Sequence, residues 1–181
     1  MEIIKKTLNG AYLLKPKVFQ DARGFFMETY SKQKFAELGI ENDFVQDNHS
    51  MSASKGVLRG LHFQHAPDTQ AKLVRVTKGS VFDVIVDLRK DSPTFGQWEG
   101  FELSAKNFLI LFVPQGFAHG FCTLEDNTEF QYKCDNYYAP ESEDGIAWND
   151  PTLNIAWPVE NPILSEKDSN AQAFAEFNSP F

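Results

Sequence analysis

The sequence predicts an all-β fold, an antiparallel sandwich or jelly roll with a few short helices at its periphery. Apolar residues recur with period 2 in several short segments, and turn residues separate these segments at short intervals. The chain also holds 17 Phe among its 181 residues. So many aromatic rings suit the wide interior between two sheets better than a slim helix bundle. We expect a single domain spanning residues 1–181.

The clearest strands are expected in the middle of the chain. Apolar residues alternate through residues 82–88, and Leu109–Val113 is an apolar run that ends at Pro114. The tripeptide 78–80, with Gly79 at its centre, reads as a hairpin turn that follows a strand at residues 73–77. Residues 130–134 alternate as well, which predicts that Tyr132 points inward together with its neighbours of the same parity.

Two short helices are expected outside the strands. Ser31 could cap the first, with Phe35 and Leu38 facing inward and Gly39 at its end. Ser165 could cap a second helix near the C-terminal end.

Charge and cysteine content limit the classes of function. The net charge of −8 argues against binding of nucleic acid, because neutralising phosphates along a strand requires a basic surface. A small phosphorylated ligand stays possible, since a few Arg and Lys side chains can hold one. Cys122 and Cys134 form no CxxC pair, so we expect free thiols in a reducing compartment. Without a signal peptide or an apolar span, the sequence predicts a cytoplasmic protein with no membrane contact.

The four His residues raise the hypothesis of a metal site. Segment Pro114–His119 resembles the second motif of cupins, and Gly56 followed by His62 resembles the beginning of the first. The first motif would have a further His at the position of Gln64, on the same strand face as His62. His65 is instead three residues from His62, on the opposite face of a regular strand. We therefore expect no metal.

The most specific string in the chain is Arg59-Gly60-Leu61-His62-Phe63-Gln64. It resembles the Arg-Gly-Leu-His signature of the dTDP-4-dehydrorhamnose 3,5-epimerase family, whose fold is a cupin-like jelly roll. Further segments similar to the family follow in order: 21–28, 46–50, 72–75, 114–121, 137–141 and 164–168. The resemblance covers roughly Arg23 to Asp168. One departure is Asp144, where the family commonly has a basic residue.

The resemblance implies epimerisation at C3 and C5 of dTDP-4-dehydro-6-deoxy-D-glucose, which gives dTDP-4-dehydro-L-rhamnose without a cofactor. The C4 ketone acidifies the hydrogens on both flanking carbons. Inversion then needs a base on one face, a proton donor on the other and a cation near the enolate oxygen. The resemblance assigns these roles to His62 as base with Asp168 as its partner, Tyr132 as acid and Lys72 as the cation.

The resemblance also implies a set of substrate contacts. Arg23 and Arg59 suit the diphosphate, because guanidinium groups bind phosphate oxygens bidentately, and Tyr138 is expected to stack on the thymine ring. The other implied contacts are Glu28, Gln46, Asn48, His119, Glu143 and Lys167. The family is homodimeric and exchanges N-terminal strands, so Arg23 and Glu28 are expected to serve the partner's site.

Three questions stay open at the level of sequence. The chain could invert both centres or only one, and it could also be a non-catalytic protein that only binds a nucleotide sugar. Strict alternation along a strand places Arg59 and His62 on opposite faces. Both can reach one site if Gly60 marks a bulge, or if Arg59 precedes the strand.

Overall fold

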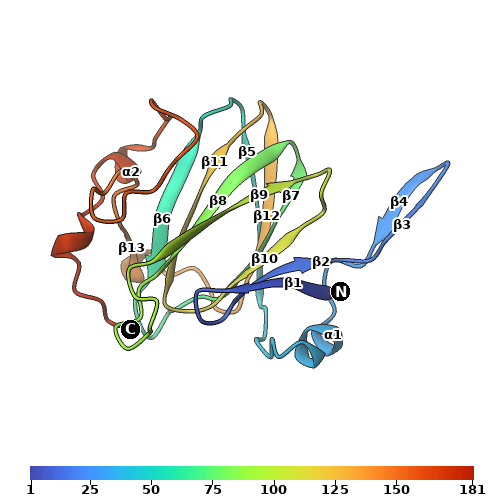
Figure 1. Cartoon of the computed structure of the whole chain (residues 1–181), viewed down its shortest axis with the longest axis horizontal. Helices are drawn as coiled ribbons and strands as arrows, with labels where there is room; N and C mark the ends of the chain where they lie inside the picture. Colours follow the sequence, from blue (N-terminus) through green and yellow to red (C-terminus); the bar gives the residue numbers. More distant parts are fainter.

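Two antiparallel sheets face each other in the computed structural model, which describes residues 1–181 (Figure 1). The six-stranded sheet comprises, in spatial order, β1 (Glu2–Thr7), β2 (Ala11–Lys15), β10 (Ile110–Val113), β7 (Lys72–Lys78), β12 (Thr128–Cys134) and β5 (Gln46–Ser52). The five-stranded sheet comprises β13 (Glu143–Gly145), β6 (Leu58–Gln64), β11 (Phe117–Thr123), β8 (Ser80–Asp87) and β9 (Trp98–Ser104). The predicted antiparallel all-β class is confirmed.

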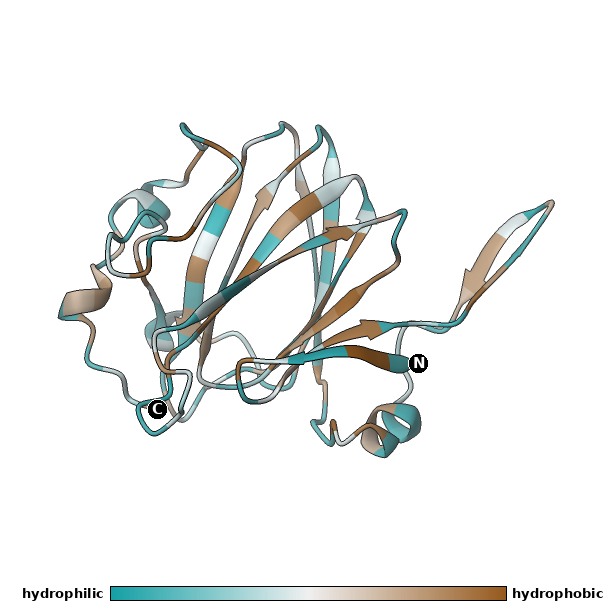
Figure 2. Cartoon of the chain, viewed as in Figure 1, coloured by the Kyte–Doolittle hydropathy of each residue, from teal (hydrophilic) through white to brown (hydrophobic).

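The space between the sheets holds the main apolar core. Val74 and Phe130 from the six-stranded sheet pack with Ile85, Phe101 and Phe121 from the facing sheet. The rings of Phe121 and Phe130 stack with centroids 4.2 Å apart. Figure 2 shows brown, hydrophobic segments along many of the strands, interspersed with teal, hydrophilic ones. Phe101, Phe117, Phe121 and Phe130 thus contribute to the inter-sheet core, whereas other Phe residues pack elsewhere or are exposed.

The turn at Gly79 is not a hairpin turn, so this prediction is wrong. Strand β7 lies in the six-stranded sheet between β10 and β12, whereas β8 lies in the five-stranded sheet. Because both edges of β7 are already paired, the chain must cross to the facing sheet. Gly79 makes this crossing with a positive φ of 75°, and a Cβ there would collide with Thr128 Oγ1.

The helices are short and peripheral. Helix α1 (Lys32–Glu37) buries Phe35 and ends at Leu38 and Gly39, but the side chain of Ser31 makes no capping hydrogen bond, contrary to expectation. Helix α2 (Glu166–Ser169) begins as the sequence predicts, with Ser165 Oγ accepting a hydrogen bond from the Asp168 backbone N–H. Two 3₁₀ turns, Pro140–Ser142 and Phe174–Glu176, complete the elements. None of the helices has the length and apolar character needed to span a bilayer.

A separate hairpin of β3 (Val18–Asp21) and β4 (Gly24–Met27) projects away from both sheets (Figure 1). Its aromatic side chains are largely exposed: Phe19 is 53%, Phe25 59% and Phe26 70% accessible. An apolar hairpin of this kind is costly to leave in water.

Candidate active site

Two adjoining cavities open between the sheets, and both are lined by His62, Lys72 and Tyr132. The first, of about 410 Å³, is also lined by Arg59 and His119. The second, of about 400 Å³, lies toward β5 and β13; its other polar lining residues are Gln46, Asn48, Gln64, Gln70, Tyr138 and Glu143. The three shared side chains come from β6, β7 and β12, so strands of both sheets meet at this point.

His62 on β6 is held by a carboxylate from α2. Its Nε2 lies 2.5 Å from Oδ1 of Asp168, which is 5% exposed, and the Ser165 hydroxyl donates to Oδ2 of the same carboxylate at 2.9 Å. Burial alone would raise the pKa of Asp168, but the hydrogen bond and charge of His62, together with Ser165 and the Gly60 backbone N–H, hold it below its usual range. Asp168 is therefore an anion that accepts from Nε2–H, and Nδ1 of His62 is left as the basic nitrogen.

A β-bulge brings Arg59 and His62 to the same cavity. His62 pairs with His119 across the sheet and Arg59 pairs with Phe121, so two residues of β6 oppose one residue of β11 between these pairs. Gly60 has a φ of 115°, and a Cβ there would lie 2.6 Å from the Cα of Gly120. Arg59 lies within β6 and does not precede the strand. The bulge at Gly60 is therefore the reason that Arg59 and His62 reach the same cavity.

Tyr132 and Lys72 face each other on neighbouring strands. Lys72 opens β7, and its Nζ lies 6.0 Å from the centroid of the Tyr132 ring without pairing with any carboxylate. Burial raises the pKa of Tyr132, and the charges of Cys134 and Glu143 add to this effect while Arg59 opposes it. Burial lowers the pKa of Lys72, against the charges of Cys134, Glu143 and Asp83. The site thus combines a protonated phenol with a buried amine that pairs with no carboxylate.

His119 on β11 has a buried partner that sequence reasoning missed. Its Nε2 lies 3.0 Å from both carboxylate oxygens of Asp83 on β8, and Asp83 is fully buried. Burial raises the pKa of Asp83, while His119 and Lys72 act in the opposite direction. The sequence does contain a signal for this partner, because Asp83 stands at an inward position of an apolar strand. A carboxylate there is unfavourable unless it accepts a hydrogen bond from a donor such as an imidazole N–H.

The outer wall of the site is built around Glu143 on β13. Its carboxylate accepts from the Tyr138 hydroxyl at 2.7 Å and lies 2.5 Å from Lys167 Nζ. Burial would raise the pKa of Glu143, but these two partners lower it below the usual range. On the adjacent β5, Gln46 accepts from the Tyr138 backbone N–H at 2.9 Å and donates to Asn48 at 3.2 Å. Hydrogen bonds and an ion pair therefore join these five residues in one group.

Arg23 and Glu28 lie outside this site in the single chain. Arg23 sits at the tip of the β3–β4 hairpin, where its exposed guanidinium pairs with Asp21 at 2.6 Å. Glu28 follows the hairpin and pairs with Lys34 of α1 at 2.8 Å. Both side chains are solvent-accessible.

The other His residues are paired away from the two cavities. Nε2 of His65 lies 3.0 Å from Asp144, which also accepts from Gln172, and Nε2 of His49 lies 3.2 Å from Glu129. The acidic residue at position 144 thus serves a local contact between β13 and the C-terminal segment. No group of three or more His, Cys, Asp or Glu side chains is arranged to hold a metal ion.

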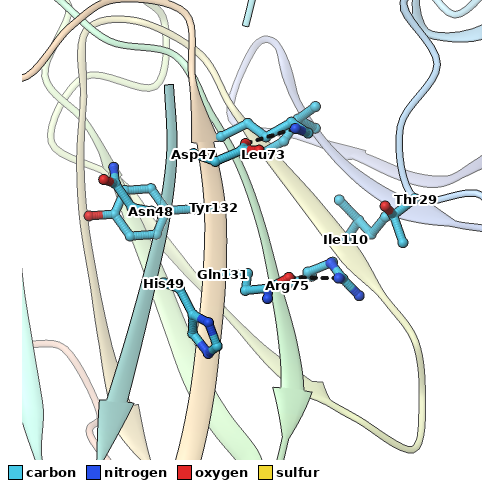
Figure 3. A pocket seen from close by; sticks show the side chains of 10 residues that line it. Thr29, Asp47, Asn48, His49, Leu73, Arg75, Ile110, Gln131 and Tyr132 are labelled. Atoms are coloured by element: carbon cyan, nitrogen blue, oxygen red, sulfur yellow. Dashed lines mark hydrogen bonds and ion pairs between the residues drawn. The ribbon is translucent and has the colours of Figure 1, made fainter. Parts of the chain in front are cut away.

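A third cavity, of about 350 Å³, lies on the outer face of the six-stranded sheet. Figure 3 shows Asn48 and Tyr132 on one side of β12, with Arg75 and Ile110 on the other. Arg75 donates to Gln131 at 2.7 Å, and burial lowers its pKa. Its apolar lining residues Leu73 and Ile110 belong to the cluster that packs against Phe35 of α1, and Lys133 pairs with Asp47.

Comparison with known proteins agrees with the geometry. The family model described as dTDP-4-dehydrorhamnose 3,5-epimerase matches residues 5–176. The dTDP-4-dehydrorhamnose 3,5-epimerase of Shigella flexneri is 54% identical over 177 residues, which cover 97% of this chain and 97% of that protein. The chain belongs to the dTDP-4-dehydrorhamnose 3,5-epimerase family.

Solved structures of the family share the whole fold. The epimerase from Bacillus anthracis, crystallised with TDP and PPi bound, is 52% identical and superimposes with a TM-score of 0.94 over 95% of this chain and 98% of that one. The Legionella pneumophila epimerase, in complex with dTDP-4-keto-L-rhamnose, is 47% identical with a TM-score of 0.93 over 98% and 94%. The predicted family and its cupin-like fold are confirmed.

Proposed function

We propose that this member of the epimerase family inverts C3 and C5 of dTDP-4-dehydro-6-deoxy-D-glucose and releases dTDP-4-dehydro-L-rhamnose. The observation that carries the proposal is that His62, Tyr132 and Lys72 together line both cavities between the sheets. A base, a protonated acid and an unpaired cation are the three groups that inversion next to a ketone requires. The identity of about half of all residues to named 3,5-epimerases supports inversion at both centres.

Each inversion consists of two proton transfers. Nδ1 of His62 removes the hydrogen from the carbon next to the ketone, and the electron pair of the C–H bond moves into the C4 carbonyl as an enolate. Lys72 stabilises the negative oxygen, and Asp168 stabilises the imidazolium that forms. The Tyr132 hydroxyl then protonates the same carbon from the opposite face as the carbonyl re-forms. Exchange with water returns the proton to Tyr132 and removes the one on His62. Only protons move, so the step consumes no redox cofactor.

The nucleotide is proposed to bind where the two cavities open. Arg59, from the first cavity, matches the diphosphate, and the exposed ring of Tyr138 matches the thymine face. Glu143 and Lys167, joined in one ion pair on the outer wall, supply further polar contacts, with Gln46, Asn48 and His119 completing the set. The relatives crystallised with TDP and with a dTDP-keto sugar support this ligand class.

We propose that two copies of the chain form the working enzyme. The exposed Phe25 and Phe26 on the projecting hairpin, and the free edge of β5, both favour a partner chain. A hairpin contributed to the partner would bring Arg23 and Glu28 to a site that lacks them in the single chain. The expected molecular mass by light scattering is twice that of one chain. A fully active species with the mass of one chain would refute the exchange.

We also propose a cytoplasmic location. Cys122 and Cys134 are both free and buried, which fits a reducing compartment. Fractionation of the source cells tests this proposal, and recovery of the protein outside the cytoplasmic fraction would contradict it.

Deuterium incorporation tests the proposed reaction. Purified protein is incubated with the dTDP-4-keto sugar in deuterated water, and the product is examined by NMR. Deuterium at both C3 and C5 of an inverted product is expected. Deuterium and inversion at one carbon only would replace the proposal with a single-centre epimerase, and binding of dTDP with no exchange would replace it with a nucleotide-sugar-binding protein.

Two variants complete the experiment. His62→Ala is expected to bind dTDP and to lose exchange at both carbons, because it removes the base. His65→Ala is a matched control, since this imidazole stands three residues away and lines neither active-site cavity. Equal activity in the wild type and His62→Ala would remove His62 from the mechanism. Activity measured with and without a chelator tests the expectation that no metal takes part.

A further inference from the structure

The site contains two imidazoles side by side, each backed by a carboxylate from a different element. His62 and His119 are direct cross-strand partners on β6 and β11. His62 is paired with Asp168 of α2, and His119 is paired with Asp83 of β8. The first pair supplies the base of the proposed reaction, whereas nothing in that reaction accounts for Asp83.

Asp83 lies at a position where a carboxylate has a large desolvation cost. It lies in the middle of β8, fully buried, between Phe101 and Phe121 on the two neighbouring strands. Its only hydrogen-bonding partner is Nε2 of His119, which lies 3.0 Å from both of its oxygens. A buried carboxylate with a single hydrogen-bond donor lowers the stability of the fold, because the loss of its hydration is only partly compensated. An apolar side chain at this position would avoid that cost.

The contact fixes the chemistry of His119. A carboxylate only accepts hydrogen bonds, so Nε2 of His119 must carry a proton. The nitrogen that remains available to a ligand in the cavity is Nδ1. The imidazole is also held between Asp83 and the ring of Phe130, whose centroid lies 6.1 Å from its own.

The second effect of Asp83 concerns charge. Lys72 reaches the same cavity and pairs with no carboxylate, and burial favours its neutral form. Three groups oppose this loss of charge: Cys134 on β12, Glu143 on β13 and Asp83 on β8. Glu143 is already committed to Lys167 and Tyr138. The Cys134 thiol, whose pKa burial raises to about 11, is neutral at pH 7. Asp83, unlike Glu143, pairs with no other Lys or Arg, so its charge is the one that favours the charged form of Lys72.

We infer that Asp83 is a positioning residue for the reaction: it fixes the orientation of His119 and keeps Lys72 charged at the place where the C4 oxygen becomes negative. The inference rests on the proposed epimerase function. Asp83 contacts no substrate atom itself and acts through the two side chains that do. A charge arrangement built before the substrate arrives need not reorganise during the reaction, which is the condition for strong stabilisation of an enolate.

The variant Asp83→Asn tests this inference, because it keeps the size of the side chain and removes its charge. We expect kcat to fall roughly tenfold or more, with little change in KM, since the lost effect concerns the enolate and not the bound ketone. Asp87→Asn is the matched control. Asp87 is equally buried, lies on the same strand with the same parity, and binds Arg89, Ser92 and Thr94 away from the cavity. It is expected to retain the kcat of the wild type per folded molecule.

The pH dependence of kcat separates the proposed role from a structural one. Removing the charge of Asp83 lowers the pKa of Lys72 further, so the alkaline limb of the profile is expected to move to lower pH in Asp83→Asn. His119, His62, Tyr132 and Glu143 also line the site, and they are unchanged in this variant. A profile that keeps its shape, or a loss of kcat that Asp87→Asn shares, overturns the inference.

A measurement on the wild-type protein covers the case in which Asp83→Asn does not fold. In protein with ¹⁵N-labelled His, NMR reports which ring nitrogen of His119 carries a proton, with the signal assigned by its absence in His119→Asn. A protonated Nε2 is expected, and an unprotonated Nε2 overturns the inference. If the wild type itself exchanges no substrate hydrogen, the proposed function fails. An active wild type with an unaffected Asp83→Asn variant contradicts only the role of Asp83.

Discussion

The two His–Asp pairs of the site have the same composition and opposite environments. Asp168 receives hydrogen bonds from His62, Ser165 and a backbone N–H, and its pKa lies below the usual range although burial acts against this. Asp83 receives one donor in the core, and burial raises its pKa. The first pair is suited to hold an imidazolium that forms and disappears during turnover, and the second to hold a fixed charge. The surroundings of a carboxylate, and not only the identity of its neighbour, therefore set its role.

The largest expected effect separates the two pairs by rate. Asp168→Asn should lower kcat by about 10²- to 10⁴-fold, because the amide neither stabilises the imidazolium nor fixes the tautomer of His62. The loss in Asp83→Asn should be clearly smaller. Glu166→Gln, an exposed neighbour on α2, serves as control in steady-state assays. Equal losses of kcat in the two Asp variants would contradict the different roles assigned to Asp168 and Asp83.

Removing the acid tests whether the first pair works alone. Tyr132→Phe should lower product formation by about 10²- to 10³-fold, since no group remains to protonate the opposite face. Exchange of substrate hydrogens with deuterated water should decrease less, because His62 and Asp168 are intact. NMR of the recovered substrate measures this exchange. If exchange and inversion fell by the same factor, Tyr132 would have to act in the first proton transfer as well.

The bulge that brings the two pairs together should be intolerant of a side chain. Gly60→Ala is expected to lower the free energy of unfolding by about 2–4 kcal/mol, because its Cβ would meet the backbone of Gly120 and His119 at 2.6 Å in a left-handed conformation. Gly24→Ala is the control: φ is 124° there, but no atom lies within 4 Å of the added Cβ. Its loss should be about 1 kcal/mol. Urea unfolding measures the free energy of unfolding of both variants. Equal losses would mean that the backbone conformation, and not the steric contact with Gly120 and His119, causes the whole effect.

The smallest expected effect is on the pH dependence of stability. The lowered pKa of Asp168 stabilises the fold at neutral pH, and this contribution is lost as pH falls below the ordinary value of 3.8 toward the folded pKa. The raised pKa of Asp83 has the opposite sign: the folded state takes up its proton first, so acidification from pH 7 relieves a cost. Asp83→Asn should therefore lose more stability than the wild type between pH 7 and about pH 4. Asp168→Asn should lose less than the wild type below that. Urea unfolding across the pH range checks both signs.

Much of this site could be predicted from the sequence, and what could not has a physical reason. Local rules identified the inward position of Tyr132, the cap of α2 by Ser165 and the bulge at Gly60 as one of two solutions. The crossing at Gly79 escaped prediction because a turn signal does not say which sheet the next strand joins. Asp83 escaped because a strand pattern shows direction but no partner, and its partner His119 lies on a neighbouring strand 36 residues away.

The pairing of His62 with Asp168 joins positions 106 residues apart. Every strand lies before Ala147, so a growing chain contains both complete sheets before α2 has been synthesised. At that stage the imidazole would stand in the cavity without its carboxylate. The pair of His62 and Asp168 can therefore form only after α2, which follows every strand in the sequence, has packed against β6.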